Sequence, residues 1–154
     1  MKGSFKVGSV EETWEVAKRF AASLRRGDVV CLEGDLGAGK TTFVQGLAAA
    51  MGVEGRVTSP TFCLVQEHRI PSKPCCEAAT ALVHMDLYRL HGEEEVLQIG
   101  WEDYLARGAV LVVEWPDRAG ALIPDDAKHV HFAYGTDETT RQLTFDGALP
   151  AATA

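Results

Sequence analysis

The start of the chain alternates a short apolar run with an amphipathic stretch. A strand is expected at 5–7, and the S-x-x-E capping box of Ser9 and Glu12 predicts that a helix begins just after it. The apolar side chains of this helix recur at intervals of three or four residues: Trp14, Ala17, Ala21 and Leu24. Because this spacing places them on one face, it predicts an amphipathic helix packed against a core.

A strand, a glycine-rich loop and a second helix follow. The apolar run 29–32 has the length of a buried strand. A helix is expected over 41–51, where Phe43, Leu47 and Met51 lie about one turn apart. Gly52 is placed to end that helix, because glycine readily adopts the left-handed conformation that closes many helices.

The rest of the chain predicts further strands and one more helix. The expected order is a loop entering a strand (56–70), an irregular connection (71–80), a strand (81–90), a helical stretch (92–108), a buried strand (109–114), a loop (115–126) and two late strands that suggest a hairpin (128–135 and 141–147). Strands interleaved with helices, followed by a hairpin, predict an α/β fold with a mixed central sheet flanked by helices. One domain is expected over 1–146, with a disordered tail at 147–154.

Composition narrows the range of functions. The 154 residues include 15 basic and 22 acidic side chains, for a net charge of −7. This balance argues against a protein that grips nucleic acid by itself, since such binding depends on neutralising phosphates. No apolar run of about 18 residues is present and the first residues are polar, so neither a membrane span nor a signal peptide is expected. Four cysteines lack metal-site spacing and predict reduced thiols in a cytoplasmic protein: Cys31, Cys63, Cys75 and Cys76.

The loop between the second strand and the second helix fits the pattern G-x-x-x-x-G-K-[ST], from Gly34 to Thr41. Its glycines allow consecutive backbone N–H groups to converge on an anion, and the helix N-terminus adds its positive dipole end. Lys40 can reach the outer phosphates of a nucleotide, and the hydroxyl group of Thr41 can bind Mg²⁺. With a buried strand before it and an amphipathic helix after it, the loop is predicted to be a P-loop that binds a nucleoside triphosphate.

Two acidic residues close hydrophobic strands of the second half, Asp86 and Glu114. The carboxyl ends of parallel strands face the same crevice as a P-loop, so both carboxylates are expected near the γ-phosphate. One would hold the metal ion and the other would orient the attacking water, and the sequence leaves both assignments open. Together with Lys40 they form the expected catalytic set.

Other residues are candidates for the same site. The segment 58–62, TSPTF, places hydroxyl groups where many P-loop proteins carry a switch segment, although a polar turn is the alternative. Trp115 is expected either in the core or facing the site, and His84 is interpreted as a structural residue. Three arginines are candidates for stabilising phosphate charge, although such residues more often form surface ion pairs: Arg56, Arg89 and Arg118.

The nucleotide is expected to be ATP, because the N-K-x-D motif usual in guanine-specific P-loop proteins is missing from the chain. Four motifs in register, GDLGAGKTTF, TSPTF, DLYRL and VEWPD, together resemble the TsaE (YjeE) family. The members of this family are small bacterial ATPases needed to make threonylcarbamoyladenosine on tRNA. The resemblance covers nearly the whole domain and implies a single P-loop NTPase domain with a mixed sheet.

The resemblance also implies roles for the matching residues. The loop that would hold the phosphates of ATP comprises Gly34, Asp35, Leu36, Gly37, Ala38, Gly39, Lys40, Thr41 and Thr42. Thr41 and Glu114 would lie at Mg²⁺, and Asp86 would be essential for hydrolysis. Thr61 would belong to the switch, Thr13 would lie near the nucleotide, and Trp115 would lie close to the site.

The family's partners are the expected partners of this chain. In the family the ATPase acts with TsaD and TsaB, and TsaD transfers the threonylcarbamoyl group, so tRNA would be engaged only indirectly. Hydrolysis would reset that complex between turnovers and would be slow without it. The connection 69–82 is longer than the family pattern leads us to expect. Two alternatives are a small-molecule or nucleoside kinase, which would need an arginine-rich lid, and a nucleotide-sensing module without catalysis.

Overall fold

A single mixed sheet organises the molecule. The computed structural model describes residues 3–34, 39–54, 57, 65–71, 79–135 and 139–146, and within them seven strands lie in the order β1-β7-β6-β2-β5-β4-β3. Their bounds are β1 Gly3–Val7, β2 Val29–Gly34, β3 Val65–Arg69, β4 Ala81–Asp86, β5 Val110–Glu114, β6 Lys128–Tyr134 and β7 Arg141–Phe145. β6, β2, β5 and β4 pair in parallel, while β7, β1 and β3 are added in antiparallel pairings. The predicted mixed α/β sheet and the late hairpin are therefore confirmed.

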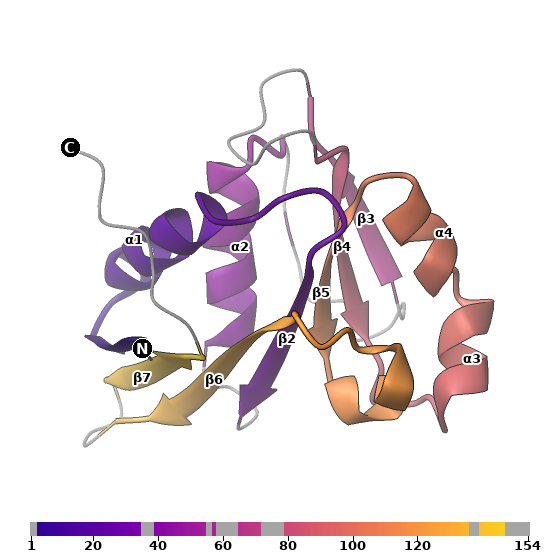
Figure 1. The fold of residues 1–154 in the computed structure, drawn as a ribbon. Helices are drawn as coiled ribbons and strands as arrows, with labels where there is room; N and C mark the ends of the chain where they lie inside the picture. The colour runs from indigo at the N-terminus through magenta and orange to yellow at the C-terminus, as the bar shows by residue number, and fades with distance from the viewer. Residues whose placement is uncertain are drawn as a thin grey trace.

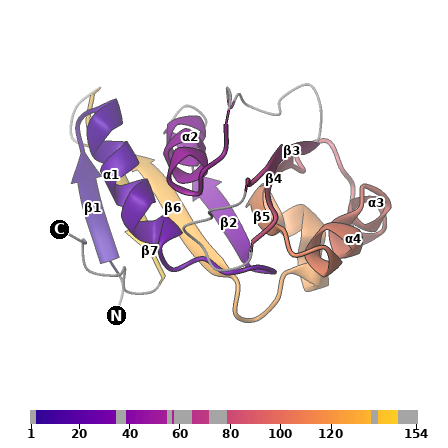
Figure 2. The ribbon, with the colours of Figure 1, turned by 90° about the horizontal axis from the view of Figure 1, so that it is seen from above.

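Helices cover both faces of this sheet. The bounds are α1 Val10–Ala21, α2 Lys40–Ala50, α3 Glu93–Gln98, α4 Trp101–Ala106 and the 3₁₀ helix η1 Pro116–Leu122. α1 and α2 pack on one face, and α3 and α4 lie on the other (Figures 1 and 2). Because side chains alternate along a strand, Val30 and Leu32 of β2 enter the α1/α2 layer, whereas Val29 and Cys31 enter the opposite layer.

At the N-terminus of α1, one of the two hydrogen bonds of the predicted capping box is present. The Ser9 hydroxyl accepts from the Glu12 N–H at 3.1 Å, but the Glu12 carboxylate accepts from the Gly8 N–H at 2.9 Å instead of from Ser9. The predicted apolar face is wrong at Trp14, which is 43% exposed. The buried face of the helix consists instead of Thr13, Val16, Ala17, Phe20 and Ala21.

α2 follows the glycine-rich loop and is packed into the core. As predicted, Phe43, Leu47 and Met51 are fully buried on one face. As predicted, Gly52 closes the helix just after its C-cap Met51: its φ is 90°, and the following Val53 N–H donates to the Ala48 carbonyl at 2.9 Å. This packing fixes the position of the helix that carries Lys40.

Three expected elements differ from the structure between 81 and 126. β4 stops at Asp86, because the chain turns after Leu87. The single helix expected over 92–108 is two short helices, because Gly100 adopts a left-handed φ of 101° that ends α3 and begins α4. The expected loop 115–126 contains η1, whose first residue is proline, a residue well suited to a helix start.

Other sequence predictions concern cysteines, the tail and membrane helices. Cys31 is buried and unpaired; its burial, with the nearby charges of Glu33 and Asp146, raises the pKa of its thiol to about 12. The other three cysteines and the tail at 147–154 lie outside the described residues. None of the helices among the described residues has both the length and the hydrophobicity that a membrane span requires.

We predict that Gly46→Val destabilises the fold. A Cβ atom at this position would lie 2.6 Å from Trp14 Cδ1 and 3.1 Å from Ala17 Cβ, so α1 and α2 would have to separate. Overpacking of this kind lowers the free energy of unfolding by about 1–3 kcal/mol, measurable by denaturant titration. Ala49→Val, at an exposed position of the same helix, is the control and should cost only about 0.6 kcal/mol. Equal losses in both variants would contradict the close approach of the helices.

Candidate nucleotide site

Side chains alternate between the two faces of each strand, and this alternation also places polar side chains at one end of the sheet. On β5, Val112 faces the α1/α2 layer, so Glu114 points to the same side. On β4, Leu82 faces that layer, so His84 and Asp86 do too. Asp86 and Glu114 are also direct partners in the register of the parallel pair β4–β5. The two carboxylates predicted to share a crevice therefore end neighbouring strands on the same face.

Lys40 reaches this end of the sheet from the first residue of α2. Its side chain is largely buried, and Nζ donates to the Gly34 carbonyl at 3.2 Å. Nζ also lies 3.7 Å from Glu114 Oε1. The lysine of the predicted P-loop and the acid that closes β5 thus form an ion pair across the predicted site.

Two glycines of the motif are required by the backbone itself. Gly34 has a φ of 135°, and a Cβ there would lie 2.1 Å from the Phe132 carbonyl oxygen. Gly39 has a φ of 102° and caps the start of α2, and among the described residues no atom outside its chain neighbours lies within 4 Å of the place where its Cβ would be. The N–H groups at the start of α2 are of the kind that bind anions in other proteins.

Glu114 is a buried carboxylate with two polar neighbours. His84, which is fully buried, places Nε2 2.7 Å from Glu114 Oε2. Burial by itself raises the pKa of Glu114, but the hydrogen bond and charge of His84 and the attraction of Lys40 outweigh burial and lower it below the ordinary value. The carboxylate is therefore ionised at neutral pH.

Asp86 and Trp115 lie at the rim of the site. Asp86 is half-buried, and its Oδ1 accepts from the Tyr88 N–H at 3.1 Å. The Tyr88 ring packs against the Trp115 ring with centroids 4.9 Å apart. Trp115 is 42% exposed and lines the same pocket as Lys40, so of the two positions considered from the sequence it takes the one that faces the site.

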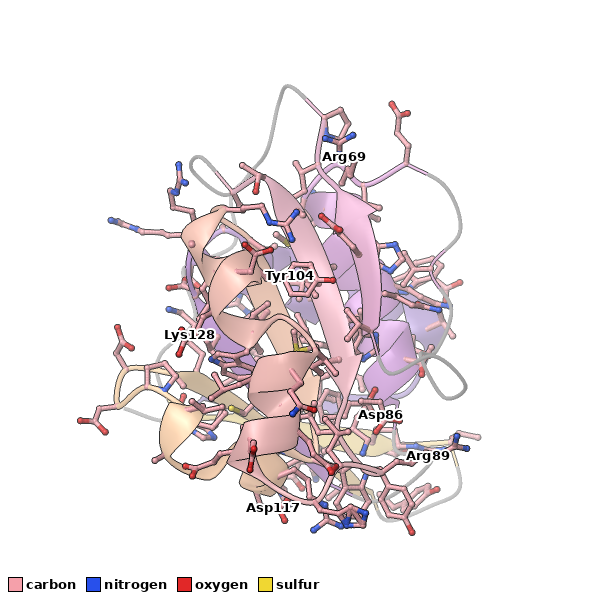
Figure 3. All side chains as sticks on the ribbon, turned by 90° about the vertical axis from the view of Figure 1, so that its right-hand side faces the viewer. Arg69, Asp86, Arg89, Tyr104, Asp117 and Lys128 are labelled. Atoms are coloured by element: carbon pink, nitrogen blue, oxygen red, sulfur yellow. The ribbon has the colours of Figure 1, made fainter. Side chains whose placement is uncertain are left out.

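A depression of about 180 Å³ opens at this end of the molecule. It is lined by Leu32, Glu33, Gly34, Lys40, Trp115, Pro116 and Asp117. Figure 3 shows Asp86, Arg89 and Asp117 gathered at this end, with Arg69 at the opposite end. The depression is thus formed by the end of β2, the start of α2 and the segment that follows β5.

The remaining predicted residues fall into three groups. Thr41 and Thr42 lie half-buried in the first turn of α2, beside Lys40. Thr13 is buried in α1, donates its hydroxyl to the Ser9 carbonyl at 3.2 Å, and does not line the depression. Several residues lie outside the described part of the chain: Asp35, Leu36, Gly37, Ala38, Arg56 and Thr61.

The candidate arginines differ in their surroundings. Arg89 is exposed near Asp86 (Figure 3). Arg118 lies 3.5 Å from the Asp117 carboxylate, with its guanidinium carbon 5.9 Å from the centre of the Trp115 ring. Both arginines therefore belong to the rim of the site.

Sequence reasoning missed the contact between His84 and Glu114. The signal was present in the strand alternation, because His84 stands two residues before Asp86 and must share its face. Gln45 was missed as well: its Nε2 donates to the Val57 carbonyl at 3.0 Å, directly before the predicted switch segment.

The sequence model of the family described as "Threonylcarbamoyl adenosine biosynthesis protein TsaE" matches residues 7–143. The chain belongs to the TsaE family. Two relatives are named tRNA threonylcarbamoyladenosine biosynthesis protein TsaE. The one from Bacillus subtilis is 37% identical over 88% of this chain and 79% of its own length. The one from Streptomyces coelicolor is 44% identical over 84% of both chains.

A solved structure supports the same assignment. The crystal structure of YdiB from Bacillus subtilis superposes with a TM-score of 0.74 at 31% sequence identity, covering 94% of this chain and 84% of that one. The resemblance to the TsaE family and the fold that it implied are therefore both confirmed.

We predict that the stabilising effect of Glu114 depends on pH. Its pKa is lower in the folded than in the unfolded protein, so the ionised carboxylate stabilises the fold above the unfolded value near 4.5. That contribution is lost as the pH falls through the lower folded value. Glu114→Gln should therefore lose on the order of 1–3 kcal/mol of unfolding free energy near neutral pH, and less in acid.

Denaturant titrations of both proteins at about pH 7 and about pH 3.5 measure this difference. Glu102→Gln, at an exposed position of α4, is the control. A gap between wild type and Glu114→Gln that stays constant over this pH range would be inconsistent with a lowered pKa.

Proposed function

We propose that this chain is a Mg²⁺-dependent ATPase that serves threonylcarbamoyladenosine modification of tRNA together with TsaD and TsaB. The observation that carries the proposal is the pairing of Lys40 with the buried carboxylate of Glu114, beside Asp86, in a chain of the TsaE family. A motif lysine and two strand-end acids are the parts with which P-loop proteins hold and hydrolyse a triphosphate.

The residues present fit Mg²⁺ and a phosphate chain. Mg²⁺ prefers hard oxygen ligands, which the Glu114 carboxylate and the Thr41 hydroxyl supply. Lys40 and the backbone N–H groups at the start of α2 suit the phosphates. When bound, Mg²⁺ would neutralise negative charge on the phosphates and so favour transfer of the γ-phosphoryl group to water.

The environments of the two acids favour different roles for them. Glu114 is buried and held between His84 and Lys40, which suits a fixed metal ligand. Asp86 is less buried and accepts one backbone hydrogen bond, which leaves carboxylate lone pairs available to orient a water molecule. Lys40 would exchange its contact with Glu114 for the phosphates.

The surface charge supports dependence on partners. With a net charge of −7, the chain is poorly suited to bind tRNA on its own. The names of its relatives place them in a tRNA modification pathway. We therefore propose that TsaD and TsaB contact the tRNA and that this chain acts on them in the cytoplasm.

We predict that Lys40→Met and Asp86→Asn abolish ATP hydrolysis in different ways. Lys40→Met keeps the volume of the buried stem but loses the charge, so binding of Mg-ATP should weaken on the order of 10-fold or more, measured by calorimetry. Asp86→Asn should bind Mg-ATP normally while hydrolysis falls by about 10²–10⁴-fold, the usual contribution of a positioned base.

Lys128→Ala and Asp103→Asn are the controls, because both residues form ion pairs of their own. Lys128, the first residue of β6, pairs with Asp28, and Asp103 of α4 pairs with Arg107. Unchanged hydrolysis in both site variants would refute the assignment. Transfer of labelled phosphate to a small molecule rather than to water would favour a kinase.

We predict that tRNA modification reconstituted with TsaD, TsaB, threonylcarbamoyl donor and tRNA needs both this chain and ATP for repeated turnover. Multiple turnovers per TsaD should appear when the complete system is assayed, and about one turnover or fewer when the chain is omitted or replaced by Asp86→Asn. Equal turnover without the chain would show that its ATPase activity serves another reaction.

A further inference from the structure

His84 lies beneath the candidate nucleotide site and belongs to no part of the P-loop motif. It stands in the middle of β4, opposite Val112 of β5 and Gln66 of β3, and its side chain is fully buried. A polar side chain in the centre of a sheet costs free energy unless it is hydrogen-bonded. Its contacts therefore indicate what it does there.

The contact between His84 and Glu114 has a defined direction. An ionised carboxylate can only accept hydrogen bonds, so His84 Nε2 carries the proton and donates it to Oε2 across 2.7 Å. The second ring nitrogen, Nδ1, is buried and has no hydrogen-bond partner among the described residues. Within the part of the chain that the structure describes, the hydrogen bonding of the ring is thus directed at Glu114.

Because of this hydrogen bond, the two oxygens of the Glu114 carboxylate have different partners. Oε2 is held by His84 on the sheet side, and Oε1 faces Lys40 at 3.7 Å on the α2 side. Without the donor on Oε2, the carboxylate would be free to rotate and offer both oxygens to Lys40. The oxygen Oε1 would then no longer have a fixed direction.

We propose that His84 is a positioning residue that orients the Glu114 carboxylate toward Lys40 and the phosphates, so that it can bind Mg²⁺. The inference rests on the proposed function, in which Glu114 is the metal ligand. Residues that hold metal ligands by a hydrogen bond commonly affect metal affinity or activity about 10–100-fold when they are replaced.

The test compares ADP binding with Mg²⁺ and with EDTA in three variants, by calorimetry. His84→Gln places an amide N–H near the position of Nε2, His84→Asn places it near Nδ1, and His84→Leu has a similar volume but no donor. We expect Mg²⁺ to tighten ADP binding strongly in wild type and in His84→Gln. In His84→Leu and His84→Asn this tightening should fall about 10-fold or more, while ADP binding in EDTA changes little.

Steady-state kinetics give a second measurement on the same proteins. In His84→Leu the concentration of Mg²⁺ needed for half-maximal hydrolysis should rise, and His84→Gln should restore it. Thermal unfolding of each variant reports any loss of stability separately from these effects.

Each result decides between distinct conclusions. Full Mg²⁺-dependent tightening in His84→Leu would overturn the positioning role. If His84→Leu does not fold, equal tightening in His84→Gln and His84→Asn would overturn it in the same way. Failure of the wild-type protein to bind ADP or ATP with Mg²⁺ would instead overturn the proposed function.

Discussion

The burial of the Glu114 carboxylate is the constraint around which this end of the sheet is arranged. A buried carboxylate costs several kcal/mol unless it is paired and hydrogen-bonded. Here the compensation comes from two directions, His84 within the sheet and Lys40 from the helix above it. The fold must therefore bring β4, β5 and the start of α2 to one place, and the positive φ angles that Gly34 and Gly39 adopt on either side of the loop make this possible.

The position of α2 depends in turn on aromatic packing. Phe43 contacts the rings of Phe20, Phe132 and Phe145, with centroids between 5.4 and 6.1 Å apart. These partners come from α1, β6 and β7, so segments that are distant in the sequence together hold α2 in position. The core is thus directly connected to the site, because Phe43 stands less than one turn after Lys40.

Much of this arrangement could be predicted from the sequence, because it follows from local patterns. The apolar run of β5 ending in Glu114 and the glycine spacing before Lys40 each have one simple structural interpretation. The break at Gly100 was missed, since apolar periodicity continues across it and only the left-handed φ reveals two helices. The pairing of His84 with Glu114 was missed because it depends on which strands are neighbours, and sheet order is not a local property.

Trp115, at the rim of the site, has an unfavourable backbone conformation. Among the described residues it is the one non-glycine with a positive φ, at 58°, a conformation that costs an L-amino acid about 1–2 kcal/mol. Glycine would adopt this geometry freely, but it would leave Tyr88 without its ring partner. The ring contact between Trp115 and Tyr88 at the rim of the site is therefore kept at a backbone cost that glycine would avoid.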